Sequence, residues 1–266
     1  MDIPLADFTP KHPWLICIDS DGCAIDSMEV KHRECFGPVA ANEWHITTGR
    51  DEFLKRWNDI NLYSVTRGIN RFKALAIIAE QFKLEGWQDL SDWTANAPVL
   101  SNDALASENN QNLKKVLQWS VDTNIAIEAL PIPSAFPGVK RVLELVNGAA
   151  DVAIVSSANR MAIKKEWQDA GLMDYVSILM SQDNGSKKTI IENLLAKGYA
   201  PGHVLMVGDA PGDMDAAYSN QVCFYPIIPG KEAGSWQALA EAQWDKFLAG
   251  NLDKSFEAQF KKELGM

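Results

Sequence analysis

The feature that most constrains this chain is a series of short apolar runs, separated by helical segments, in its second half. Apolar runs rich in branched residues predict strands at 152–155, 176–179, 204–207 and 222–225. Segments with apolar residues at helical spacing predict helices at 139–146, 159–170, 187–197 and 214–219. Strands that alternate with helices in this way predict a parallel sheet covered by helices on both faces. We therefore expect an α/β fold, a Rossmann-like doubly wound parallel sheet.

One further strand is predicted at the other end of the chain. The run WLICI at 14–18 is apolar and ends abruptly in Asp-Ser-Asp-Gly. The stretch from about 29 to 130 has no convincing β run, and its segments 51–60 and 71–82 carry apolar residues at helical spacing. A proline-rich segment at 131–138 precedes the remaining strands. We predict a core domain of residues 1–27 and 131–266, interrupted by an all-helical domain at 28–130, with terminal helices in the last 30 residues.

Charge and cysteine content restrict the partners and the compartment. The 266 residues carry a formal net charge of −10, which argues against binding to a nucleic-acid backbone or an anionic membrane surface. The four cysteines show no C-x-x-C spacing and are expected to be reduced thiols. The N-terminal residues lack the pattern of a signal peptide, and no apolar run approaches membrane-spanning length. We expect a cytoplasmic protein without a nucleic-acid or membrane partner; the sequence carries no signal of oligomeric state.

Polar side chains follow several of the predicted strands. In an open parallel sheet, ligands bind outside the carboxyl ends of the strands, so these side chains are expected to converge on one edge. A group of carboxylates with one lysine suits Mg²⁺, which prefers oxygen ligands and often shares its coordination shell with a substrate phosphate. A carboxylate could then attack phosphorus. The polar residues concerned are Asp19, Asp21, Ser156, Ser157, Lys187 and Asp209.

Four segments, taken in order, resemble the motifs of haloacid dehalogenase-like phosphatases. WLICIDSDGCAIDS is similar to the first motif, an apolar strand followed by D-x-D-G. VAIVSS resembles the second, a strand that ends in Ser or Thr, and GSKKTIIENLLAKG resembles the third, a lysine that opens a helix. VLMVGDAPGDMDAA matches the fourth, G-D-x-x-x-D. The helical stretch between the first two motifs lies where this family places a small domain that covers the substrate.

The resemblance implies a role for each matching residue. Asp19 would be the nucleophile, and Asp21 would protonate the leaving oxygen and then activate water. Ser156 would hydrogen-bond the phosphoryl group, and Lys187 would pair with its charge and with the nucleophile. Mg²⁺ would be bound by Asp19, Asp209 and the backbone carbonyl of Asp21. Asp213 would be a further ligand or a group that orients Asp209.

Each motif also has a structural interpretation. Asp-x-Asp-Gly suits a turn, and Ser156 and Ser157 suit a helix cap. Lys188 competes with Lys187 for the lysine role, because the third motif lacks the usual Lys-Pro pair. We favour Lys187, since apolar positions of the following helix lie at the expected offsets from it.

The helical insertion contains one concentration of basic residues. In LYSVTRGINRF, Arg67 and Arg71 flank Gly68 and could present guanidinium groups to a substrate. A helix–helix turn whose arginines pair with surface acids explains them equally well. The resemblance to the family assigns the adjacent pair Asp26 and Ser27 to an extension of the first motif, and we expect a structural role for that pair.

These features predict a Mg²⁺-dependent phosphohydrolase of a small phosphorylated metabolite that acts through an aspartyl phosphate. One alternative within the family is a sugar phosphomutase of the beta-phosphoglucomutase type, because the motifs do not distinguish the two reactions. A catalytically silent binding protein that keeps the fold is a second alternative, although none of the residues to which the motifs assign a catalytic role is lost.

Overall fold

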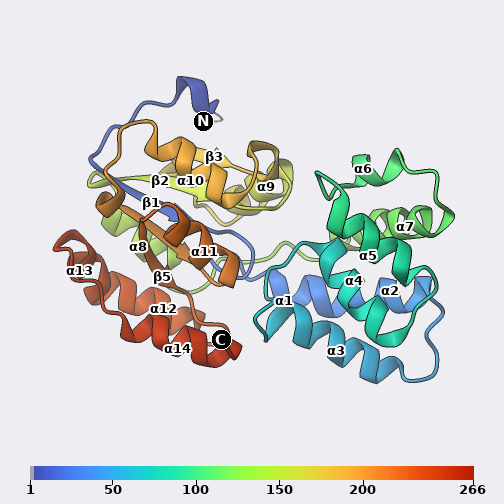
Figure 1. Cartoon of the computed structure of the whole chain (residues 1–266). Helices are drawn as coiled ribbons and strands as arrows, with labels where there is room; N and C mark the ends of the chain where they lie inside the picture. Colours follow the sequence, from blue (N-terminus) through green and yellow to red (C-terminus); the bar gives the residue numbers. More distant parts are fainter. Residues whose placement is uncertain (1–2) are drawn as a thin grey trace. The chain divides into compact units, whose positions relative to one another are not determined.

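The computed structural model describes residues 3–266 and comprises two compact units, which are considered separately. The core unit consists of Met1–Ser27 and Ile132–Met266, and the helical unit consists of Met28–Pro131 (Figure 1). The chain therefore leaves the core unit directly after the Asp-Ser-Asp-Gly segment and returns to it in the proline-rich segment.

The core unit contains a five-stranded sheet in which every pair of neighbouring strands is parallel, with the order β3-β2-β1-β4-β5. Because β1 lies in the middle of this order, the strand order reverses next to it, as in a doubly wound fold. The predicted fold class is confirmed. The strands are β1 (Trp14–Ile18), β2 (Ala150–Val155), β3 (Ile178–Met180), β4 (Val204–Gly208) and β5 (Cys223–Pro226).

Alternate side chains of β1 enter two separate apolar layers, as the two-residue period of a strand requires. Ile16 and Ile18 pack with residues of α8, α9 and the C-terminal helices, while Leu15 and Cys17 pack with residues of α10, α11 and α14. The sheet is thus covered on both faces, and its central strand is apolar throughout because neither face meets water. The helices are α8 (Val139–Val146), α9 (Arg160–Asp169), α10 (Lys187–Leu195), α11 (Pro211–Ser219), α12 (Glu232–Ala238), α13 (Trp244–Leu248) and α14 (Ser255–Leu264).

Two elements of the core unit begin at other residues than expected, and several short helical turns complete the unit. A 3₁₀ turn at Met173–Tyr175 delays the strand expected from residue 176, so β3 begins at Ile178. Helix α11 begins at Pro211 and not at 214, because proline is well tolerated in the first turn of a helix. The other such segments are η1 (Leu5–Asp7), η4 (Gln182–Asn184), η5 (Pro201–His203) and the π-helical η6 (Leu239–Gln243).

The helical unit has an apolar core of its own. Trp57 and Trp119 are fully buried at its centre, with ring centroids 5.9 Å apart in an edge-on arrangement. No strand occurs among the residues of this unit, all of which are described. Its helices are α1 (Met28–Val30), the π-helical η2 (Lys31–Phe36), α2 (Gly37–Glu43), α3 (Arg50–Leu62), α4 (Arg71–Phe82), α5 (Trp87–Asn96), α6 (Asn102–Ala106) and α7 (Gln111–Glu128).

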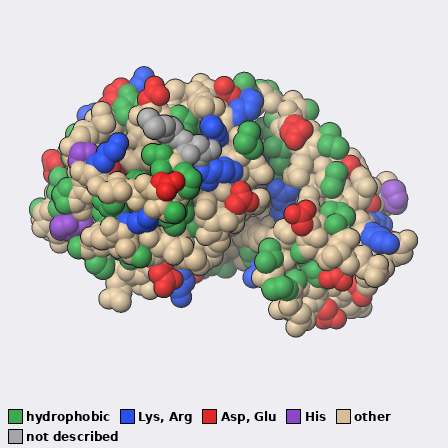
Figure 2. Space-filling model, turned by 90° about the horizontal axis from the view of Figure 1, so that it is seen from above, with side chains coloured by type: hydrophobic (Ala, Val, Ile, Leu, Met, Phe, Trp, Pro, Cys, Tyr) green, Lys and Arg blue, Asp and Glu red, His purple; other side chains and the backbone are tan. Residues whose placement is uncertain are grey.

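Acidic and basic side chains are interspersed on the surface. Figure 2 shows both signs of charge scattered among polar and apolar side chains on the face in view. Over residues 3–266, no helix combines the length and the apolar character that crossing a bilayer demands.

Candidate active site

Asp19 directly follows β1 and begins a tight loop, residues 19–25, here called the aspartate loop. The backbone N–H of Asp19 donates to the carbonyl of Val207 on β4 at 3.0 Å, which continues the ladder between the two strands by one bond. The carbonyl of Ser20 then accepts the N–H groups of residues 23, 24 and 25 at 3.3, 3.0 and 2.9 Å. Gly22 has a φ of +76°, a conformation that glycine adopts without steric cost. The loop is therefore compact and held by its own backbone.

Three buried carboxylates gather at this end of the sheet. Asp19, Asp209 and Asp213 each offer an oxygen, and these oxygens lie within 4.8 Å of one another. Asp19 follows β1 and Asp209 follows β4, so the parallel pairing of the two strands brings them together. Asp213 comes from the first turn of α11. We call these three residues the carboxylate cluster.

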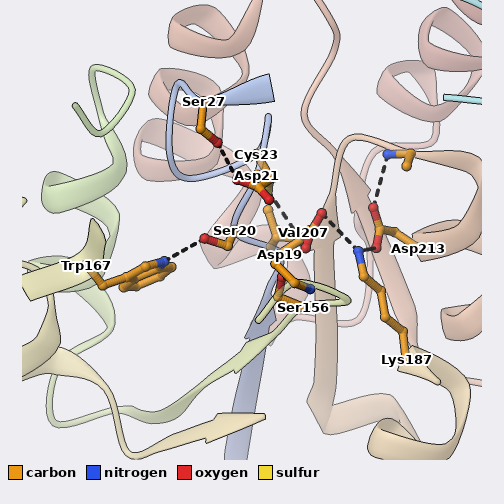
Figure 3. A network of polar contacts seen from close by, with 12 residues as sticks. Asp19, Ser20, Asp21, Cys23, Ser27, Ser156, Trp167, Lys187, Val207 and Asp213 are labelled. Atoms are coloured by element: carbon orange, nitrogen blue, oxygen red, sulfur yellow. Dashed lines mark hydrogen bonds and ion pairs between the residues drawn. The ribbon is translucent and has the colours of Figure 1, made fainter. Parts of the chain in front are cut away.

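Lys187, at the start of α10, bridges two members of the carboxylate cluster (Figure 3). Its Nζ lies 2.9 Å from Asp19 Oδ2 and 2.6 Å from Asp213 Oδ1. Lys188 is exposed, and its carbonyl accepts a hydrogen bond from Asn220. Of the two lysines between which the sequence left a choice, the structure brings Lys187 to the carboxylates.

Asp213 is fixed on both of its oxygens. Oδ1 contacts Lys187, and Oδ2 accepts the backbone N–H of Ala210 at 3.0 Å. A Cβ at position 208 would lie only 2.3–2.4 Å from atoms of the Asp213 side chain, so the close approach requires Gly208. Both oxygens of Asp213 therefore have a partner within the protein.

The carboxylate cluster brings three like charges close to one ammonium group. Three carboxylates and one ammonium group leave two negative charges in a buried space if all are ionised. Burial raises the pKa of Asp19 well above its usual range, Lys187 opposes that rise, and Asp213 and Asp209 add to it. Burial alone would lower the pKa of Lys187, but Asp19 and Asp213 outweigh it and raise that pKa. These carboxylates thus favour the charged form of Lys187, and a further cation would favour ionised Asp19.

Asp21 is half-buried, and its carboxylate has a partner from the end of the first core segment. The hydroxyl of Ser27, which is fully buried, donates to Asp21 Oδ1 in a very short hydrogen bond. The Ser27 hydroxyl also lies 3.5 Å from the carbonyl of Ile25. The Ser27 hydroxyl thus orients the Asp21 carboxylate, a contact that the sequence analysis did not predict.

Ser156 follows β2, next to β1 in the sheet, and is buried. Its backbone N–H donates to Met180 at 3.1 Å, and its hydroxyl oxygen accepts the N–H of Ala158 at 3.2 Å. Because that oxygen accepts from the backbone, the hydroxyl proton can be donated to a bound oxyanion. Ser157 is exposed, and Asn159, not either serine, caps α9.

Arg67 and Arg71 lie in the helical unit and make contacts within it. Arg67 is 4% exposed and donates to the carbonyl of Leu62 at 2.8 Å. Arg71 donates to Asn124 Oδ1 at 2.6 Å and lies over the ring of Phe36, 4.9 Å from its centroid. The segment that carries both arginines joins α3 to α4, and these contacts are with a carbonyl, an amide oxygen and an aromatic ring. A contact of either arginine with a substrate stays a prediction.

Sequence reasoning missed the residues that hold the aspartate loop from outside. Trp167 of α9 and Trp236 of α12 each donate an indole N–H to this loop. Ser27 was assigned only a structural role, on its position in the motif. For Ser20 the sequence carried one signal. This serine lies between two aspartates directly after an apolar strand, and a buried hydroxyl has to find a hydrogen-bond partner.

The fold and this constellation define an α/β protein with an aspartate at the end of its central strand, and a comparison with models of protein families agrees with the four motifs. Residues 96–225 match the model of the family described as haloacid dehalogenase-like hydrolase. That range includes β2 to β4, Ser156, Lys187 and Asp209, and it ends within β5. The resemblance to the haloacid dehalogenase-like family that the four motifs predicted is confirmed. No curated protein matches the chain.

Solved structures of low sequence identity share the fold. A protein from Lactobacillus delbrueckii subsp. bulgaricus, assigned as a phosphoglycolate phosphatase, is 13% identical with a TM-score of 0.54, and the match covers 96% of this chain and 100% of that one. For a predicted phosphoglycolate phosphatase from Haemophilus somnus 129Pt the values are 16%, 0.53, 84% and 92%. For a protein from Thermotoga maritima, assigned as a beta-phosphoglucomutase, they are 13%, 0.52, 85% and 99%.

Proposed function

We propose that this protein is a Mg²⁺-dependent phosphohydrolase that cleaves phosphomonoesters of small metabolites through an aspartyl phosphate on Asp19. The observation that carries the proposal is the carboxylate cluster, in which Asp19 lies at the end of the central strand, 2.9 Å from Lys187. Structures of the same fold that are named as phosphoglycolate phosphatases support it.

The donors of the carboxylate cluster fit a magnesium ion. They are oxygens, they are close together and buried, and they carry more negative charge than Lys187 balances. Asp19, Asp209 and the backbone carbonyl of Asp21 would hold the ion, and Asp213 would keep Lys187 and the start of α11 in place. When bound, Mg²⁺ supplies positive charge that offsets the repulsion between the carboxylates and a phosphate.

The protein's own groups would then carry out two displacements. In the first, an oxygen of Asp19 forms a bond to phosphorus while the bond from phosphorus to the ester oxygen breaks, and protonated Asp21 gives its proton to that leaving oxygen. In the second, Asp21 accepts a proton from water as the water oxygen attacks phosphorus and Asp19 is released. Lys187 and the Ser156 hydroxyl stabilise the charge on the phosphoryl oxygens.

The proposal is tested by phosphate release from an aryl phosphate and from a panel of phosphorylated metabolites. We expect release by the wild type with Mg²⁺, no release with chelator, and loss of release in Asp19→Asn. Release that survives Asp19→Asn would contradict the assignment of the nucleophile. Absence of release from every compound by the wild type would contradict the hydrolase itself.

A sugar phosphomutase is the second candidate, favoured by the shared fold with the protein assigned as a beta-phosphoglucomutase. In that reaction the phosphoryl group on Asp19 returns to a bound sugar phosphate and not to water. Isomerisation of a hexose 1-phosphate without net phosphate release would establish it.

We further propose a cytoplasmic location and a small phosphorylated metabolite as the partner. None of the four cysteines forms a disulfide, and three of them are buried, as expected of a protein from a reducing compartment. We also propose Arg67, Arg71 and Ser157 as substrate contacts, and the helical unit as the cover of the site.

A further inference from the structure

Two tryptophans from distant parts of the core unit donate hydrogen bonds to the aspartate loop. Trp167 Nε1 lies 3.0 Å from the hydroxyl oxygen of Ser20, and Trp236 Nε1 lies 2.9 Å from the carbonyl of Cys23. Both tryptophans are fully buried in the apolar layer that also contains Ile16 and Ile18. The two indoles thus connect the packed interior to the loop that carries Asp19 and Asp21.

The bond from Trp167 reaches the residue between the two aspartates. An indole N–H can only donate, so the Ser20 hydroxyl is the acceptor. Ser20 is completely buried, and in Figure 3 its side chain points toward Trp167, while Lys187 lies on the other side of Asp19. The carbonyl of the same residue accepts three N–H groups of the loop. A shift of Ser20 would therefore displace the whole loop.

We propose that Trp167, acting through Ser20, is a positioning residue that keeps Asp19 and the backbone carbonyl of Asp21 in the arrangement that binds Mg²⁺ and attacks phosphorus. The inference rests on the proposed function. Misplacement of reacting groups by about 1 Å can reduce a rate about 100-fold, so one hydrogen bond at this point can affect turnover more than it affects stability. A merely structural bond would affect stability alone.

Three variants separate these roles: Trp167→Phe, Ser20→Ala and the double variant. Each single substitution leaves one buried polar group without its partner, which destabilises the fold. The double variant removes both polar groups, so its melting temperature is expected to recover relative to Trp167→Phe. Positioning, by contrast, does not recover, because the hydrogen bond between Trp167 and Ser20 is missing in all three variants.

We expect kcat to fall about tenfold in both single variants and to stay equally low in the double variant, with KM within about twofold. The Mg²⁺ concentration at the midpoint of the metal-dependent rise in melting temperature should increase several-fold in the double variant. Trp244→Phe is the matched control, since Trp244 is a buried tryptophan of the same apolar layer and no hydrogen bond to the aspartate loop is found for it. Its kcat and Mg²⁺ midpoint should equal those of the wild type.

A double variant whose kcat and Mg²⁺ midpoint return to wild-type values would overturn the inference and leave the proposed function intact. A wild type without phosphatase activity would remove the proposed function, and the Mg²⁺ midpoint would then decide alone. A raised midpoint in the double variant supports positioning of the metal-binding loop. An unchanged midpoint, or no response to Mg²⁺ in the wild type, overturns it.

Discussion

Two buried aspartates at opposite ends of one sheet show how differently a protein can treat the same side chain. Asp19 follows the last residue of β1, and Asp151 is the second residue of β2. Asp151 accepts hydrogen bonds from the backbone N–H groups of residues 11 and 12 at 2.9 and 3.1 Å, from Tyr199 at 2.6 Å and from Ser177 at 3.4 Å. Asp19 shares its only lysine with Asp213 and lies beside two other carboxylates.

The difference lies in what surrounds each charge. Neutral donors satisfy both oxygens of Asp151, and the result is a structural anchor that ties the N-terminal segment to the sheet. At the other end, like charges are brought together at a cost that folding alone does not explain. A cluster of this kind points to a cation or a reacting group as the missing partner.

The largest effect is expected when the cluster loses its one cation. Lys187→Met would remove the ammonium group that contacts Asp19 and Asp213, which costs about 3–5 kcal/mol of folding free energy and reduces kcat about 10³-fold. Melting curves and phosphate release measure both, and the loss of stability should be larger with chelator than with Mg²⁺. Lys188→Met, at the exposed neighbour, is the control and should behave as the wild type; a reversed result would transfer the role to Lys188.

The response of the protein to Mg²⁺ should depend on the carboxylate cluster and not on Asp151. With chelator, we expect phosphate release to fall about 10³-fold, because several kcal/mol of transition-state stabilisation are lost. Mg²⁺ at about 100 times its dissociation constant should add about 2.7 kcal/mol to the stability of the wild type. Asp209→Asn should lose this response, and Asp151→Ala should keep it. A response that persists in Asp209→Asn would place the ion elsewhere.

Substitution of Asp151, the structural anchor, should lower stability and leave turnover unchanged. Asp151→Ala leaves the Tyr199 hydroxyl and two backbone N–H groups without their acceptor, so we expect a loss of about 2–3 kcal/mol in the free energy of unfolding. Because this residue lies at the far end of β2 from Ser156, kcat/KM at a temperature where the variant is folded should stay within about twofold of the wild type. Urea denaturation and steady-state kinetics measure the two quantities. A loss of turnover without a loss of stability would contradict the structural role of Asp151.

A smaller effect is expected from a hydroxyl that orients the second aspartate. Ser27→Ala removes one donor to Asp21, which holds its carboxyl group less firmly, and we expect kcat to fall about tenfold with little change in KM. Ser177→Ala removes a serine that contacts Asp151 and serves as the counterpart at the other end. That variant should lower the melting temperature and leave kcat unchanged. Equal effects of the two substitutions on kcat would argue against orientation by Ser27.

The smallest effect concerns the phenol that contacts the anchor. Burial raises the pKa of Tyr199, and its hydrogen bond to Asp151 raises it further. The folded state therefore favours the neutral phenol, so this contribution is complete below the unfolded pKa of about 10 and is lost as the pH rises further. Tyr199→Phe should cost about 1 kcal/mol at neutral pH. The difference from the wild type, measured by urea denaturation, should shrink above pH 10; a constant difference would mean that Tyr199 does not titrate with unfolding.

Several elements of the fold follow directly from the sequence. The run WLICI gives β1 with the expected bounds, because an apolar segment of that length with branched residues is buried on both faces of a parallel sheet. The same rule brings the residues after β1, β2 and β4 to one edge, where Asp19, Ser156 and Asp209 lie. For each of them, position in the sequence and position in the fold are linked by strand pairing alone.

Other features depended on the tertiary structure, because the partners are far apart in the chain. Trp167 and Ser20 are 147 residues apart, and Tyr199 and Asp151 are 48 apart. Hydrophobic periodicity marks such tryptophans as interior residues and does not say which polar group an indole N–H will meet. The sequence by itself determined the strands, their parallel arrangement and the residue types at their ends. Only the packing of helices against the sheet decided which indole meets Ser20 and which buried aspartate is left with neutral donors.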